Sequence, residues 1–79
     1  MDTVPWPLQK IIDTANALHA SGSSGASTGE QIAAAFVLNR QDYLPDSERD
    51  LVAAWDRLGH SWQAHVRLIQ RDYLHLIVR

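Results

Sequence analysis

The feature that most constrains this chain is an unbroken run of seven apolar residues, IAAAFVL, at positions 32–38. A helix on a protein surface normally keeps one polar side, and this run leaves none. We therefore expect the stretch from Gly29 to Tyr43 to form a helix that is covered on nearly all sides, either by the rest of the chain or by a partner.

The length of 79 residues fits one domain, near the size at which a single hydrophobic core is just sufficient. Apolar residues make up 46% of the chain and include three tryptophans, which is enough for such a core. We predict a single helical domain over residues 1–79. The sequence contains no cysteine, which excludes disulfides, cysteine zinc sites and thiol catalysis.

The composition indicates a cytoplasmic protein with no membrane segment. No stretch approaches the roughly 18 to 20 apolar residues of a membrane span, and residues 1–5 lack the basic and apolar regions of a secretory signal. Six arginines against one lysine, with abundant alanine, indicate a bacterial source. The net charge of −2 is opposite in sign to the basic excess that most nucleic-acid binders carry.

The first helix is predicted over residues 7–19, because proline suits the first turn of a helix and an apolar stripe follows it. The stripe has helical spacing and consists of Leu8, Ile11, Ile12, Ala15 and Leu18. Residues 21–28 are rich in serine and glycine, so a flexible loop is expected there.

The second helix has two possible start signals. Ser27 with Glu30, and Thr28 with Gln31, both match the capping-box spacing, in which two side chains satisfy free backbone N–H groups at a helix start.

The end of the second helix is predicted at Tyr43. Ile32, Phe36, Asn39 and Tyr43 repeat at helical spacing, and Pro45 stops the helix. Asn39 is interpreted as an amide that bonds to the backbone near a helix end.

The third helix is predicted to begin at Asp46 or Ser47, both good N-caps, and to end at Gly59 in a left-handed conformation. Its buried stripe is expected to be Leu51, Val52, Trp55 and Leu58.

A fourth helix is predicted from Ser61, with its core face at Trp62, Val66, Ile69, Tyr73, Leu76 and Ile77. Residues 73–78 also fit an extended strand, because they include β-branched and aromatic side chains. The resulting fold is a compact all-α, four-helix domain whose second helix is the most enclosed.

The end of this fourth helix suggests an interaction surface. Leu74 and Val78 fall on its solvent side, where an apolar pair is typical of a contact with another protein. Trp6 is expected to extend this surface. We therefore predict a non-catalytic regulatory or accessory protein that binds a protein partner or a second copy of itself as a homodimer.

A nucleic-acid-binding regulator is the alternative. A short turn at residues 59–61 precedes the fourth helix, as in a helix-turn-helix. Gln63, Arg67, Gln70 and Arg71 lie on its polar side, and such side chains can read base edges.

The sequence predicts no catalytic residues, no metal site and no cofactor. His65, Asp72 and His75 share one flank of the fourth helix, but His65 is about 10 Å away along the axis, so three ligands do not converge. The serines lie in the loop or at helix caps, and no nucleophile motif is present.

Overall fold

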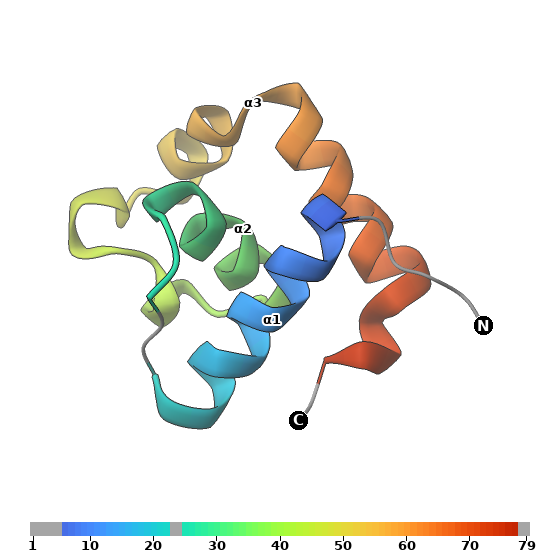
Figure 1. Ribbon diagram of the computed structural model, residues 1–79. Helices are drawn as coiled ribbons and strands as arrows, with labels where there is room; N and C mark the ends of the chain where they lie inside the picture. Colours follow the sequence, from blue (N-terminus) through green and yellow to red (C-terminus); the bar gives the residue numbers. More distant parts are fainter. Residues whose placement is uncertain (1–5, 23–24, 78–79) are drawn as a thin grey trace.

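The computed structural model describes residues 6–22 and 25–77, and within them all regular structure is helical (Figure 1). The elements are α1 (Trp6–Ser21), α2 (Thr28–Leu38), η1 (Gln41–Tyr43), η2 (Asp46–Glu48), α3 (Leu51–Leu68), η3 (Ile69–Tyr73) and η4 (Leu74–Leu76). The Cα radius of gyration is 11.5 Å, close to the about 11.6 Å expected for a compact domain of this length.

The apolar run forms the enclosed helix that its sequence predicts. In α2, five residues are buried: Ile32, Ala33, Ala34, Ala35 and Val37. Successive helix positions point about 100° apart, so three buried alanines in a row mean that α2 is covered on several sides. Figure 1 shows α2 in the centre, with α1 on one side and α3 arching over it.

The helix α1 supplies one wall of this core, and all five residues of its predicted stripe are buried. The buried hydroxyl of Thr14 donates to the carbonyl of Lys10 at 2.8 Å, so it is satisfied within the helix. The helix is longer than predicted, running from Trp6 to Ser21.

The start of α2 confirms one of the two predicted capping boxes. The amide of Glu30 donates to the Ser27 hydroxyl at 3.3 Å, and the Glu30 carboxylate accepts from the Ser27 amide at 3.0 Å. The loop before it is shorter than the expected 21–28, because Ser21 belongs to α1 and Thr28 to α2. Residues 23–24 lie outside the described part.

The end of α2 differs from the prediction. The helix stops at Leu38, and Asn39 adopts a left-handed conformation with φ 56° and ψ 43°. Asparagine tolerates this region better than other side chains with a Cβ, which makes it a natural helix terminator. Tyr43 therefore lies in the separate turn η1, and its helical spacing from Asn39 was misleading.

The start of the third helix also differs. Asp46 and Ser47 belong to the short turn η2, and Asp50 caps α3 by accepting from the amide of Ala53 at 3.1 Å. Two of the four residues of the predicted stripe lie outside the core. Leu51 is 44% exposed and Val52 73% exposed.

The core face of this segment is formed by Ala54 and by Leu58 of the predicted stripe, and Trp55 of the same stripe is half-buried against the core.

The predicted division into third and fourth helices is not confirmed as two elements. A single helical element, α3, spans Leu51 to Leu68, but Gly59 within it has φ 78° and ψ 168°, which is not helical and kinks the element. The described part of the chain thus has three α-helices, the last of them bent where glycine was expected to end a helix.

The C-terminal segment stays helical through Leu76, so the extended alternative is wrong for residues 73–76, and of residues 73–77 only Ile77 has an extended backbone. A wide π turn forms η3, and a tight 3₁₀ turn forms η4. Val66, Ile69 and Ile77 are buried as predicted, but Leu76 is 36% exposed. Among residues 6–22 and 25–77, no helix is long and apolar enough to cross a membrane.

Candidate functional site

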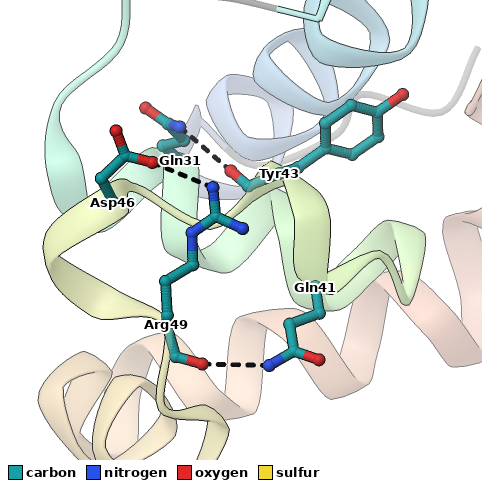
Figure 2. A network of polar contacts seen from close by, with 5 residues as sticks. All are labelled: Gln31, Gln41, Tyr43, Asp46 and Arg49. Atoms are coloured by element: carbon teal, nitrogen blue, oxygen red, sulfur yellow. Dashed lines mark hydrogen bonds and ion pairs between the residues drawn. The ribbon is translucent and has the colours of Figure 1, made fainter.

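Residues 39–50 connect α2 to α3, and hydrogen bonds from glutamine side chains hold this connection in place (Figure 2). The Nε2 of Gln31, on α2, donates to the Tyr43 carbonyl at 3.0 Å. The Nε2 of Gln41 donates to the Arg49 carbonyl at 3.0 Å, and Arg49 Nη2 pairs with Asp46 Oδ1 at 2.9 Å. These contacts hold η1 and η2 in a defined path beside α2.

Arginines neutralise three of the five acids between positions 42 and 56. Besides the pair of Arg49, Arg40 binds both oxygens of Asp42 at 2.9 and 2.7 Å, and Arg57 approaches Glu48 at 3.3 Å.

The hydrogen bond from Arg40 lowers the pKa of Asp42. The other two acids, Asp50 and Asp56, are exposed and form no ion pair with any described residue. The connection therefore keeps a residual negative charge.

A hollow of about 290 Å³ lies between this connection and the helices. Its lining combines apolar and polar residues: Ala35, Phe36, Asn39, Arg40, Gln41, Leu44 and Leu51. Leu51, at the first turn of α3, borders the hollow, and the exposed Val52 follows it directly. We call Leu51, Val52 and the lining of this hollow the Leu51–Val52 surface.

Sequence reasoning missed this surface because it placed Leu51 and Val52 in the core. Asp50 could have indicated the true start of α3, since aspartate is a good N-cap. Asp46 and Ser47 are equally good N-caps earlier in the chain, so the sequence did not decide between them.

The residues of the predicted interaction surface do not form one patch in the structure. Leu74 is half-buried, packs against the core and lines a second hollow of about 430 Å³ that also includes His19 and Gln70. Trp6 is 74% exposed, but it is about 20 Å from His19 along the axis of α1. Val78 lies outside the described residues.

The four residues of the nucleic-acid alternative already have partners within the chain. Gln63 Nε2 donates to the Trp55 carbonyl at 2.7 Å, and Gln70 Nε2 donates to the Phe36 carbonyl at 3.0 Å.

The two arginines of that set are also engaged. The Arg67 guanidinium lies 5.3 Å from the centroid of the Trp55 ring. Arg71 pairs with Asp72 at 2.9 Å and lowers the pKa of that carboxyl.

No group of three or more metal-ligating side chains occurs among residues 6–22 and 25–77. In the same residues, every buried side-chain nitrogen or oxygen has a hydrogen-bond partner. The exposed features of the region around the first hollow are the apolar side chains of Leu51 and Val52 and the carboxylate of Asp50, which forms no ion pair with a described residue. Comparison with known proteins adds no assignment: no family model, curated protein or solved structure matches this chain.

Proposed function

We propose that this protein is a non-catalytic helical module that binds another protein through the Leu51–Val52 surface. The observation that carries the proposal is the exposure of Leu51, which lines a hollow of mixed apolar and polar residues, together with the exposure of the adjacent Val52. Burying such side chains against a partner is favourable, because it removes apolar area from water.

The chemistry of the surface fits the apolar face of an amphipathic helix that carries basic residues at its border. A hollow of about 290 Å³ is at the lower end of enclosed small-molecule sites, but it can receive one or two side chains of a helix. Asp50 and Asp56 leave negative charge beside it, and complementary charge speeds association and selects the partner.

The polar groups around the hollow support binding rather than catalysis. Arg40 is held by Asp42, and the Gln41 amide is held by the Arg49 carbonyl. The pKa of Asp42 is lowered, which keeps this carboxylate ionised and unsuited to act as a general acid or base near neutral pH.

The proposal is tested by NMR titration of the protein with a synthetic amphipathic helix made of leucine and lysine. We expect chemical-shift changes concentrated at the Leu51–Val52 surface, and at least about a tenfold weaker affinity for Val52→Lys, since this variant places an unpaired positive charge against an apolar face bordered by lysines. Ala64→Lys is the matched control, because it places the same charge at an exposed apolar position of α3 outside this surface. Equal affinities of Val52→Lys and the wild type would refute the proposal.

Self-association through Leu74, Val78 and Trp6 remains a separate prediction. Light scattering at micromolar concentration measures it directly, and Leu74→Asp should abolish any dimer formed this way. Loss of peptide binding in Leu74→Asp, with binding intact in Val52→Lys, would move the binding site to the second hollow.

Nucleic-acid binding ranks second, because Gln63, Gln70 and Arg71 already hold contacts within the chain. Binding to duplex DNA that weakens steeply with salt and depends on Arg67 and Arg71 would reverse this order.

A further inference from the structure

The bend in α3 rests on a single residue. Gly59 has φ 78° and ψ 168°, a conformation that is essentially restricted to glycine. The chain is helical on both sides of it, with Leu51–Leu58 before the bend and His60–Leu68 after it. A Cβ placed on Gly59 would meet no atom within 4 Å, so only the backbone conformation requires glycine here.

The bend brings together side chains that a straight helix would separate. Gln63 Nε2 donates to the carbonyl of Trp55, eight residues earlier, at 2.7 Å. In a straight helix these residues would be about 12 Å apart along the axis. The hydrogen bond therefore forms within one chain only while Gly59 is bent.

Straightening α3 at Gly59 would carry residues 60–77 away from the core as a unit. This segment contributes the buried side chains of Val66, Ile69 and Ile77, and Gln70 donates to the carbonyl of Phe36 on α2. Exposing these groups in a monomer would be unfavourable. The same groups would be buried again if residues 60–77 took the equivalent place in a second copy.

We propose that α3 is a hinge at Gly59 and that two copies of this chain can exchange residues 60–77 to form a domain-swapped dimer. In such a dimer, residues 60–77 of each copy make with the other copy the contacts that they make within the monomer. The two copies are related by a twofold axis, so no further copies are added. The difference in free energy between the bent and the straight conformation at residue 59 determines the equilibrium between monomer and dimer. This exchange is independent of the Leu51–Val52 surface, because all residues of that surface precede the bend.

The decisive variant is Gly59→Ala, which penalises the bent conformation and favours a straight helix. Each copy carries one hinge, so a penalty of about tenfold per hinge strengthens the swapped dimer by about a hundredfold. We expect Gly59→Ala to elute as a dimer at micromolar concentration in size-exclusion chromatography with light scattering, while the native sequence is mainly monomeric there.

Two glycine variants serve as controls. Gly22→Ala meets a similar positive φ of 76° and also has no atom within 4 Å of the new Cβ, but Gly22 does not connect two helical segments. Gly29→Ala lies inside α2, where φ is not positive. Both variants should remain at the oligomeric state of the native sequence.

Cross-linking distinguishes an exchanged dimer from a side-by-side dimer. His19 and Gln70 are exposed and line the same hollow, one before and one after the hinge, and the chain has no cysteine of its own. In His19→Cys/Gln70→Cys with Gly59→Ala, a short thiol cross-linker should join two different chains on a denaturing gel. In the same double variant with Gly59 retained, it should join each chain to itself.

Three results would overturn the proposal. The first is a monomeric, folded Gly59→Ala protein at millimolar concentration, and the second is a Gly59→Ala dimer whose cross-links stay within each chain. The third is a Gly59→Ala protein that circular dichroism shows to be unfolded at millimolar concentration, because exchange would have provided a folded alternative. A cross-linked native dimer after refolding at millimolar, but not micromolar, concentration would support the hinge independently.

Discussion

Enlarging the buried alanines of α2 tests the claim that this helix is enclosed on several sides. Ala33, Ala34 and Ala35 are at most 2% exposed and point in three directions about 100° apart. Replacing any one of them with leucine forces three extra carbons into a packed position. An amphipathic helix would tolerate this change on its solvent side, whereas an enclosed helix would tolerate it nowhere.

The expected size of the effect follows from packing energetics. Overpacking a core site costs about 1 to 3 kcal/mol, against a total stability of about 4 to 12 kcal/mol for a domain of this length. With a urea dependence of about 1.5 kcal/mol per molar, each variant should lower the unfolding midpoint by about 0.7 to 2 M.

Urea unfolding followed by tryptophan fluorescence measures this shift in all three variants. Ala64→Leu is the matched control, because Ala64 is an exposed alanine within α3, and its midpoint should stay close to that of the wild type. If even one of the three α2 variants unfolded at the wild-type midpoint, that side of the helix would be open and the enclosed arrangement would be wrong.

Three further predictions concern the helix ends and the surface charges. Ser27→Ala removes the capping box and should lower the free energy of unfolding, measured in urea, by about 1 kcal/mol. An unchanged free energy of unfolding would contradict the observed cap. Asn39→Ala should destabilise by about 1 to 2 kcal/mol, while Asn39→Gly should not, and thermal unfolding compares the two. Because Arg40 lowers the pKa of Asp42, this pair stabilises the fold above the pKa of the unfolded aspartate and loses that contribution as the pH falls through the lowered value. Asp42→Asn should therefore lower the urea midpoint slightly near neutral pH and not in strong acid, and an equal effect in both would argue against the pair.

Several local features of the fold were predictable from the sequence because short-range chemistry determines them. The stripe of α1, the capping box at Ser27 and the burial of residues 32–35 depend on spacing and residue type alone. The positive φ of Gly59 was also predictable, since glycine accepts that conformation without strain.

Helix register was harder to predict where several residues compete for one role. Asp46, Ser47 and Asp50 can each cap a helix, and the choice of Asp50 turned Leu51 and Val52 toward solvent. At the C-terminal end, the π turn of η3 changes the helical period. A regular 3.6-residue pattern therefore placed Leu76 in the core, although it is exposed.

The candidate site depends on long-range contacts that the sequence pattern does not reveal. The hollow exists because residues 39–50 follow a path beside α2, and that path is held by side-chain bonds from Gln31 and Gln41 to backbone carbonyls. A glutamine in a helix looks like an ordinary polar surface residue until its carbonyl partner is known.

The side-chain amide contacts have a consequence for how this protein responds to its surroundings. Five neutral amides donate to backbone carbonyls elsewhere in the described part of the chain: Asn16, Gln31, Gln41, Gln63 and Gln70. A carboxamide gains or loses no proton in the physiological range, and dissolved ions screen it far less than they screen a charged pair. Acidity and ionic strength should therefore alter the exposed ion pairs while the internal geometry persists, so the same shape is presented over a wide range of solution conditions.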